Sequence, residues 1–347
     1  HWLLSPHTIL RPEPLGALFF HRQTAETLQL DLEGLEALLN LVSGKRVFSF
    51  RHFFFKSYLY ARGFIKRGHS EQAIQTVQDC FQQAPKMQVP LRSRSVPEAL
   101  HLTIIDQCNQ SCAGCFYRQS SPQSLVQLMS WERYQKIINQ AAQHKVFQIA
   151  LGGGEPFLHP QLIPMVQYAH QKGLVPNLTT NGNLLTLALA SQLKEAGLGQ
   201  LQLSLNGSTE SMNKLTRPNF QATLQAMQIC HKAHLRWGLN ILVTQQNLPH
   251  LEELLRLAQH TQAYSVNLLR PKPSLFDSQW LAHVLPTSTD NKALQKILQQ
   301  WQRKASFLLT TDASLTFLHA TSPKSLQQNG LTGCPAGRRM VSIFPNG

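Results

Sequence analysis

Short aliphatic runs alternate with longer stretches of helical periodicity from residue 99 onward. Such alternation is typical of βα units built around a parallel sheet, so the predicted fold class is α/β. The runs predict six strands, at Ala99–Ile105, Val146–Leu151, Val175–Thr180, Gln200–Leu205, Trp237–Val243 and Ser265–Leu269. Crossover helices are predicted between them, among others at Trp131–His144, Gln161–Lys172 and Phe220–Ala233. Six right-handed βα units can form an open doubly wound sheet or a partial barrel, and in both the ligand chemistry lies at the carboxyl ends of the strands.

The first 95 residues have a different pattern. Two short apolar runs, Gly16–His21 and Thr27–Asp31, flank a polar turn and predict a hairpin. Helical periodicity follows, and a proline-containing stretch then indicates a linker. The predicted helices are Leu32–Val42, Phe50–Ile65 and Ser70–Ala84, and the linker prolines are Pro85, Pro90 and Pro97. We therefore expect a separate α+β module and linker over residues 1–95.

Composition narrows the class of protein. The chain has 347 residues, enough for two domains and a packed core, and 42% of them are hydrophobic, which argues against disorder. Its formal net charge of +14 comes from scarce acids, since only 14% of residues are charged. The chain has no run of apolar residues long enough to predict a membrane span.

Three cysteines lie close together in the loop that follows the first predicted strand of the α/β region. Cys108, Cys112 and Cys115 form a C-x3-C-x2-C arrangement, whereas Cys80, Cys230 and Cys334 are isolated. Clustered thiols without a signal-peptide pattern indicate a metal site in a reducing, cytoplasmic setting. Three thiolates can hold three corners of a 4Fe-4S cube and leave one iron free. A zinc site would need a fourth ligand, for which His101 is a candidate, and chemically inert cysteines are the remaining alternative.

A glycine-rich turn follows the second predicted strand. Gly152, Gly153 and Gly154 allow close approach of a backbone to a ligand, and Glu155 adds a carboxylate that can accept from an ammonium group. A plain glycine-rich βα turn is the alternative interpretation.

The cysteine motif and the Gly-Gly-Glu motif together resemble the radical S-adenosylmethionine (SAM) superfamily. The resemblance implies that Cys108, Cys112 and Cys115 bind a 4Fe-4S cluster, that Phe116 is the aromatic residue that follows the last ligand, and that Gly153, Gly154 and Glu155 bind the amino group of SAM. Weaker matches are Thr179 to Gly182 with the family's TNG turn and Leu203 to Gly207 with its SLDG segment, in which Asn206 replaces the usual aspartate. They imply SAM contacts for Ser204 and for Arg217, which could equally be a solvated surface residue.

The family's chemistry is implied by the same resemblance. One electron supplied by a ferredoxin- or flavodoxin-type reductant cleaves SAM at the cluster, and a 5′-deoxyadenosyl radical then abstracts hydrogen from the substrate. The predicted fold becomes a partial (β/α)6 TIM-like barrel over residues 96–305.

Both ends of the chain carry further resemblances. Cys334 and the residues up to Gly347 resemble the start of a SPASM or twitch domain, which implies that Cys334 ligates an auxiliary 4Fe-4S cluster and that residues 306–347 are a truncated part of that domain. Residues 1–95 resemble the winged-helix RiPP recognition element, which binds leader peptides of ribosomally made, modified peptides. A basic surface would favour an acidic leader.

The sequence therefore predicts a radical SAM maturase that acts on a precursor peptide. The expected outcomes are a thioether or cyclophane crosslink, epimerisation, or tyramine-excising splicing to a β-amino acid. One alternative is a radical SAM enzyme that modifies RNA, but the charge is spread over the whole chain, and neither nucleic acid nor membrane is an expected partner. The others are a non-catalytic iron–sulfur or zinc protein, which leaves the Gly-Gly-Glu turn unexplained, and an activase that forms glycyl radicals.

Overall fold

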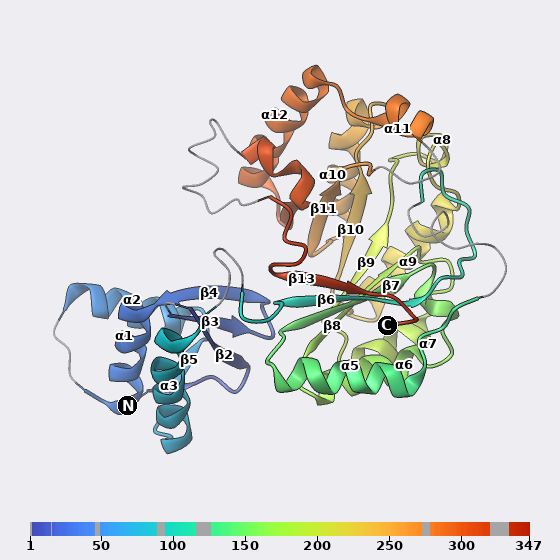
Figure 1. Ribbon diagram of the computed structural model, residues 1–347. Helices are drawn as coiled ribbons and strands as arrows, with labels where there is room; N and C mark the ends of the chain where they lie inside the picture. Colours follow the sequence, from blue (N-terminus) through green and yellow to red (C-terminus); the bar gives the residue numbers. More distant parts are fainter. Residues whose placement is uncertain are drawn as a thin grey trace. The chain divides into compact units, whose positions relative to one another are not determined.

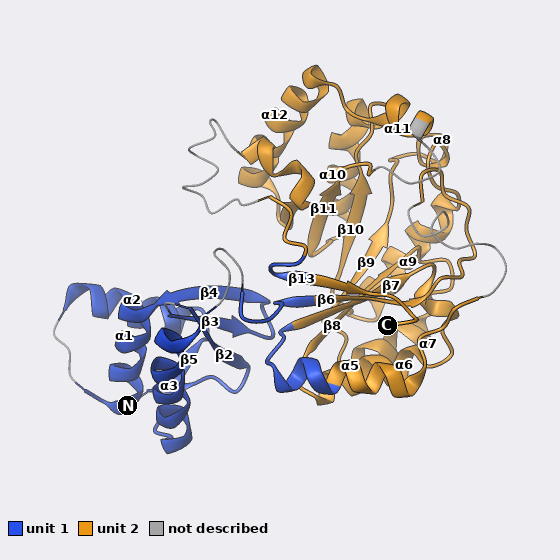
Figure 2. Ribbon diagram, in the orientation of Figure 1, with its two compact units in different colours: residues 1–99, 139–147, 337–340 blue, residues 100–138, 148–336, 341–347 orange. Residues whose placement is uncertain are grey.

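The computed structural model describes residues 2–14, 16–45, 49–88, 94–115, 126–272, 278–319 and 333–347. The chain divides into two compact units (Figure 2). The first comprises residues 1–99, 139–147 and 337–340, and the second comprises residues 100–138, 148–336 and 341–347.

The first unit contains a three-stranded antiparallel sheet in the order β2-β3-β4, a separate antiparallel pair of β1 with β5, and helices (Figure 1). All six residues of β3, the central strand, are buried. Phe19 from this strand packs with Leu35, Leu38 and Phe64 in the core of the unit. The elements are β1 (Trp2–Leu4), β2 (Thr8–Glu13), β3 (Gly16–His21), β4 (Glu26–Asp31), α1 (Leu32–Ser43), α2 (Phe50–Ala61), β5 (Ile65–Arg67), α3 (Glu71–Gln83) and the 3-10 turn η1 (Ala84–Lys86).

Local signals fix the helix ends of this unit. Asp31 and Ser70 cap α1 and α3, because their side chains accept from the main-chain N–H groups of Gly34 and Ala73. The predicted helix Phe50–Ile65 is wrong at its end. The helix stops at Ala61 because Gly63 takes a left-handed conformation, φ 75°, and Ile65 then pairs with β1 as the first residue of β5.

A buried ion pair lies at the end of β2. Arg11 and Glu13 are each 3% exposed, and the Nη2 of Arg11 lies 2.7 Å from the Oε1 of Glu13. The guanidinium also donates to the carbonyl oxygens of Val96, Pro97 and Lys145 at 3.0 to 3.2 Å. The second carboxylate oxygen of Glu13 accepts from the main-chain N–H of Ser95 at 2.8 Å. The centroid of the Phe147 ring lies 4.5 Å from the guanidinium carbon of Arg11.

The second unit is built on an eight-stranded sheet in the order β12-β11-β10-β9-β8-β7-β6-β13. The strands from β7 to β12 pair in parallel, each with its neighbour. The strands are β6 (Ala99–Ile105), β7 (Gln148–Gly153), β8 (Val175–Thr180), β9 (Gln200–Ser204), β10 (Trp237–Leu242), β11 (Ser265–Leu269), β12 (Leu308–Thr311) and β13 (Met340–Ile343). The helices and 3-10 turns are α5 (Trp131–Gln143), η2 (Pro156–Leu158), α6 (Leu162–Gln171), α7 (Leu187–Glu195), α8 (Glu210–Lys214), α9 (Phe220–Lys232), η3 (Leu248–His250), α10 (Leu251–His260), α11 (Ser278–Val284), α12 (Ser288–Lys304) and η4 (Ala313–His319).

Alternation along the strands separates two faces of this sheet. Aliphatic side chains such as Leu178, Leu201 and Leu239 are fully buried, whereas the neighbouring positions carry polar residues such as Asn177 and Gln202. The helices α5, α6, α7 and α9 lie on one side of the curved sheet, as a (β/α) barrel requires (Figure 1). The predicted α/β fold with a partial barrel is confirmed.

All six predicted strands are present, and one of them is displaced from its predicted bounds. The strand predicted at Val146–Leu151 begins two residues later, at Gln148, because Val146 and Phe147 lie in the irregular connection between the turn after α5 and the strand. The sheet also gains β12 and β13, which come from residues beyond 305 and were not predicted. Among the described residues, no helix is both long and apolar enough to cross a membrane.

Candidate functional site

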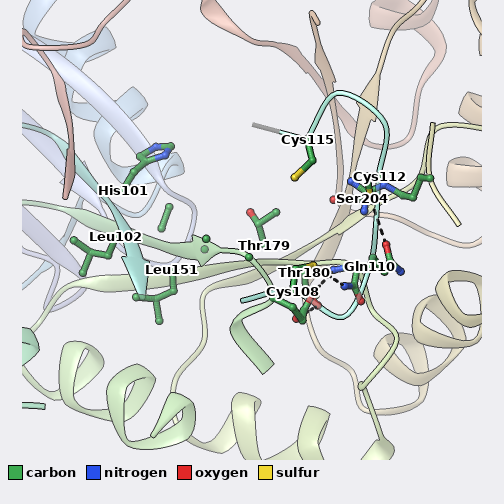
Figure 3. Close-up of a pocket in the computed structure, with 17 residues that line it drawn as sticks. His101, Leu102, Cys108, Gln110, Cys112, Cys115, Leu151, Thr179, Thr180 and Ser204 are labelled. Carbon is green, nitrogen blue, oxygen red and sulfur yellow. Dashed lines mark hydrogen bonds between the residues drawn. The ribbon is translucent and has the colours of Figure 1, made fainter. Parts of the chain in front are cut away.

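A cavity of about 240 Å³ opens at the carboxyl ends of the barrel strands (Figure 3). Four successive strands, β6 to β9, and the loops that follow them supply its walls. Its lining includes Cys108, Gln110, Cys112 and Cys115 from the loop after β6, Gly152 to Glu155 from the end of β7, Thr179 to Asn181 from the end of β8, and Ser204 and Arg217 from the end of β9 and beyond. The structure therefore brings together nearly all of the site residues that the sequence predicted.

The cysteine loop contacts two other segments of the second unit. The main-chain N–H of Ala113 donates to the carbonyl of Thr216 at 2.9 Å, which joins the loop to the segment after β9. Gly114 has φ 64°, and a Cβ atom there would lie 2.1 Å from the ring of Trp280 on α11. Phe116, the predicted aromatic neighbour of the last ligand, lies outside the described residues.

The three cysteine thiols line one cavity without forming a site for a single ion. Among the described residues, no three histidine, cysteine, aspartate or glutamate side chains are gathered as one metal ion would require. His101, the candidate fourth zinc ligand, lines the same cavity from β6 but is not part of such a group. Burial raises the pKa of the Cys108 thiol, against the main-chain N–H of Gln110, which donates to that sulfur. A zinc ion needs four ligands at about 2.0–2.3 Å from one point, whereas a four-iron cluster spaces its cysteines widely.

The glycines of the Gly-Gly-Glu turn allow it to touch the cysteine loop. A Cβ atom at Gly154 would lie 2.0 Å from the carbonyl oxygen of Gln107, and one at Gly153 would lie 2.1 Å from that of Ile105. Main-chain N–H groups of Gly154 and Glu155 donate to those same two carbonyls at 2.8 Å. The turn and the loop are thus one hydrogen-bonded layer, and any side chain at these two positions would separate them. Gly152, in contrast, has open space where its Cβ would be.

Glu155 is 1% exposed, and its carboxylate accepts three hydrogen bonds. Its Oε1 accepts from the hydroxyl of Thr180 at 2.7 Å and from the N–H of Phe157 at 3.1 Å, and its Oε2 accepts from the N–H of Asn181 at 2.9 Å. Burial raises the pKa of Glu155, although these three donors oppose the shift. Each carboxylate oxygen can accept two hydrogen bonds, so Oε2 keeps capacity for a donor in the cavity. Asn181 also donates to the side chain of Asn109 at 2.8 Å, which ties the TNG turn to the cysteine loop.

Ser204 and Arg217 approach the cavity from the β9 side. Ser204 is 9% exposed at the end of its strand. The Nε of Arg217 is buried and has no hydrogen-bond partner among the described residues. Asn206, which replaces the family's usual aspartate, fixes this region instead of facing a ligand: its amide donates to Thr216 at 2.9 Å and accepts from the N–H of Leu242 at 2.9 Å. That role needs both a donor and an acceptor, which a carboxylate does not provide.

The remaining cysteines are not among the residues that line the cavity. Cys334 is exposed in the described part of the chain and does not line the cavity. Cys80 and Cys230 are buried, and burial raises the pKa of each thiol to about 12. Sequence reasoning missed Gln110 and Trp280. Trp280 belongs to no motif, whereas Gln110 occupies a variable position between two cysteines of the motif, and that position was a usable signal.

The donor set fits a 4Fe-4S cluster with SAM. Three thiols face a cavity in which the Nε of Arg217 and the Nε2 of Gln110 are buried without a partner among the described residues. Orphaned buried donors are rare in folded proteins unless a bound group satisfies them. Cys108, Cys112 and Cys115 thus bring three thiols to this cavity, and Glu155 and Arg217 bring a hydrogen-bond acceptor and a cation to it.

The chain is similar to a known protein family and to curated relatives. Residues 102–258 match the model of the Radical SAM superfamily, in agreement with the resemblance that the cysteine and Gly-Gly-Glu motifs predicted. Among curated relatives, the mycofactocin maturase MftC of Mycobacterium tuberculosis is 28% identical over 260 residues, which cover 74% of this chain and 64% of the relative. The PqqA peptide cyclase of Ruegeria pomeroyi is 26% identical over 249 residues, 70% of this chain and 64% of the relative. The alignments thus span less than two thirds of either relative.

Solved structures show the same fold. SuiB of Streptococcus suis bound to S-adenosylmethionine has a TM-score of 0.72 and 16% identity, with 99% of this chain and 81% of that chain covered. SuiB bound to the precursor peptide SuiA has a TM-score of 0.70 and 16% identity, with 100% of this chain and 82% of that chain covered.

Proposed function

We propose that this chain is a radical SAM maturase of a ribosomally made precursor peptide. The observation that carries the proposal is the cavity in which Cys108, Cys112 and Cys115 lie against the Gly-Gly-Glu turn at the carboxyl ends of the barrel strands. The named relatives, a mycofactocin maturase and a PqqA peptide cyclase, support a peptide as the class of substrate.

The chain's own residues have distinct roles in this proposal. The three cysteines would bind a 4Fe-4S cluster through their thiolates. Arg217, with its unpartnered Nε, binds the SAM carboxylate, and Glu155 accepts from the SAM amino group through the free capacity of Oε2. Ser204 contributes a hydroxyl at the β9 side. When bound, the cluster and SAM supply a 5′-deoxyadenosyl radical for hydrogen abstraction, and the barrel positions the peptide and excludes water.

The N-terminal unit supplies the leader-binding function. Its β4 is an edge strand, because the sheet order is β2-β3-β4, and an extended peptide can add to such an edge. The end of α2 lies against the start of β4, where Tyr58 and Arg62 both bond to Glu26. The same helix exposes Phe50, Phe53 and Phe54 and carries Arg51 and Lys56 without an acidic residue. This combination suits an acidic leader with apolar side chains.

The proposal also includes an electron donor and an auxiliary cluster. An acidic ferredoxin or flavodoxin in a reducing, cytoplasmic setting donates the electron, and the net charge of +14 would favour its approach. Cys334 ligates an auxiliary 4Fe-4S cluster as part of a SPASM or twitch domain.

The first test is SAM cleavage. After anaerobic reconstitution, the protein with SAM and dithionite should form 5′-deoxyadenosine, and triple replacement of Cys108, Cys112 and Cys115 with alanine should abolish the product and lower the iron content by the iron of the SAM-binding cluster. Cys230→Ala is the matched control, because that thiol is buried on α9 outside the cavity. A reconstituted wild-type protein that forms no 5′-deoxyadenosine contradicts the enzyme proposal.

The second test identifies the modification by mass spectrometry of a candidate precursor peptide after reaction. A loss of two hydrogen atoms indicates a crosslink, an unchanged mass with altered chirality indicates epimerisation, and a loss of a tyramine unit indicates splicing. For the leader, Arg51→Glu with Lys56→Glu should weaken binding of an acidic precursor in fluorescence anisotropy, whereas Arg256→Glu on α10 should not. Equal affinity in all three proteins would remove α2 from the leader site.

A further inference from the structure

Gln110 lies between two of the proposed cluster ligands. Its side-chain Oε1 accepts from the Cys112 thiol at 3.5 Å (Figure 3). The residue is 8% exposed and lines the same cavity as the cysteines. A long polar side chain in this position needs a reason, because burial of an amide costs free energy unless its groups are bonded.

Only half of the Gln110 amide is satisfied. The Nε2 atom is buried and has no hydrogen-bond partner among the residues that the structure describes. A buried amide N–H without a partner is less readily tolerated than an under-used carbonyl oxygen. In the protein without its cluster, the Nε2 donor of Gln110 is therefore left for a group that the chain itself does not supply.

Cluster binding changes what Cys112 requires. A cysteine that ligates iron is a thiolate, which has no proton to donate and accepts hydrogen bonds instead. The Oε1 contact to Cys112 is then acceptor against acceptor. A half turn of the carboxamide exchanges its oxygen and nitrogen with almost no change in shape, and it brings the orphaned Nε2 to the Cys112 sulfur.

We propose that Gln110 is a tuning residue that donates an N–H···S hydrogen bond to ligated Cys112 and thereby raises the reduction potential of the SAM-binding cluster. Reduction adds negative charge to the cluster and its thiolates, and a fixed donor stabilises that charge. The inference rests on the proposed function, because it requires the cluster to bind these three cysteines. It assigns a role to a variable position of the cysteine motif, and the residue acts through a ligand.

The test is a mediated redox titration of the reconstituted protein without SAM or substrate, followed by electron paramagnetic resonance. Gln110→Leu and Gln110→Met remove the donor and keep the bulk, and both should shift the midpoint potential to more negative values at unchanged iron content. Gln110→Glu, which presents an acceptor, should shift it further still. Gln107→Leu is the matched control, since this glutamine is in the same loop, is exposed and does not line the cavity.

The outcomes separate this inference from the proposed function. Wild-type potentials in fully loaded Gln110→Leu and Gln110→Met would overturn it. Loss of iron from both variants would also overturn it, because Gln110 would then serve only the folding of the loop. A wild-type protein that assembles no 4Fe-4S cluster would instead refute the proposed function itself.

Discussion

Two buried polar clusters of this chain differ in how completely the protein satisfies them. In the N-terminal unit, the Nε, Nη1 and Nη2 atoms of Arg11 all have partners, and both carboxylate oxygens of Glu13 accept hydrogen bonds. In the barrel cavity, the Nε of Arg217 and the Nε2 of Gln110 are equally removed from water but have no partner among the described residues. Burial of polar groups alone therefore does not mark a binding site here.

The difference shows what each cluster is for. A closed network holds chain segments in place, and Arg11 joins β2 to the carbonyls of Val96, Pro97 and Lys145. An open network keeps hydrogen-bonding capacity for a group that is not part of the chain. Variants in the first cluster should change stability, and variants in the second should change ligand binding. Four predictions examine this division.

The largest effect is expected for Arg11→Met. The substitution leaves the carboxylate of Glu13 buried without its cation, so the free energy of unfolding should fall by about 3–5 kcal/mol. Urea denaturation measures it. The double variant Arg11→Met with Glu13→Leu should recover much of the loss, because no charge is then stranded. A single variant as stable as the wild type would show that the network is not structural.

Arg217→Met should have the opposite signature. Its guanidinium has an unpartnered Nε, so the unfolding free energy should change by less than about 0.5 kcal/mol. Loss of a hydrogen bond to the charged SAM carboxylate should weaken SAM binding by about 1.5–3 kcal/mol, roughly ten- to a hundredfold. Equilibrium dialysis with reconstituted protein measures the affinity. Arg256→Met on α10 is the control, and a similar effect there would argue for bulk charge.

Gly154→Ala tests whether cluster binding depends on the close contact between the Gly-Gly-Glu turn and the cysteine loop. The new methyl group would lie 2.0 Å from the carbonyl oxygen of Gln107, so the turn and the cysteine loop must separate. We expect a loss of about 1–3 kcal/mol in stability together with reduced iron content after reconstitution. Gly152→Ala is the matched control, because nothing lies within 4 Å of its Cβ position. Equal iron content and stability in the two variants would contradict the packing account.

The sequence predicted much of the site and less of its frame. The Cys108 loop and the Gly-Gly-Glu turn were found because ligand spacing and consecutive glycines are local signals, and each follows a strand whose aliphatic run is visible. Other contacts join residues that are distant in sequence. Thr180 and Asn181 donate hydrogen bonds to Glu155, and Asn206 bonds to Thr216 and Leu242. The strand β12 was missed because Leu308–Thr311 is only four residues long, half of it polar, and gains its strand conformation from pairing with β11.

The smallest predicted effect concerns Glu98, whose network is closed but less buried than that of Arg11. Its carboxylate accepts from Arg339 at 2.7 and 2.8 Å and from Arg94 at 3.1 Å, and it is 12% exposed while Arg339 is 49% exposed. Burial alone would raise the pKa of Glu98, but the bonds and charges of Arg339 and Arg94 outweigh it and hold the pKa below its ordinary value of 4.5. Solvent around Arg339 limits the benefit, so Glu98→Gln should cost about 1–2 kcal/mol at neutral pH.

The sign of the pH dependence follows from the direction of that shift. A carboxyl with a lowered folded-state pKa stabilises the fold fully above its unfolded-state pKa, and it loses that contribution as the pH falls through the folded-state value. The stability difference between wild type and Glu98→Gln, measured in urea from neutral pH downward, should therefore be constant until about pH 5 and shrink below it. Glu71→Gln, a 96% exposed carboxylate on α3, should show a difference under about 0.5 kcal/mol throughout. If the stability difference between wild type and Glu98→Gln instead grew on acidification, burial would dominate the pKa of Glu98. The ion pairs of Glu98 with Arg94 and Arg339 would then not count as a satisfied network like that of Arg11 and Glu13.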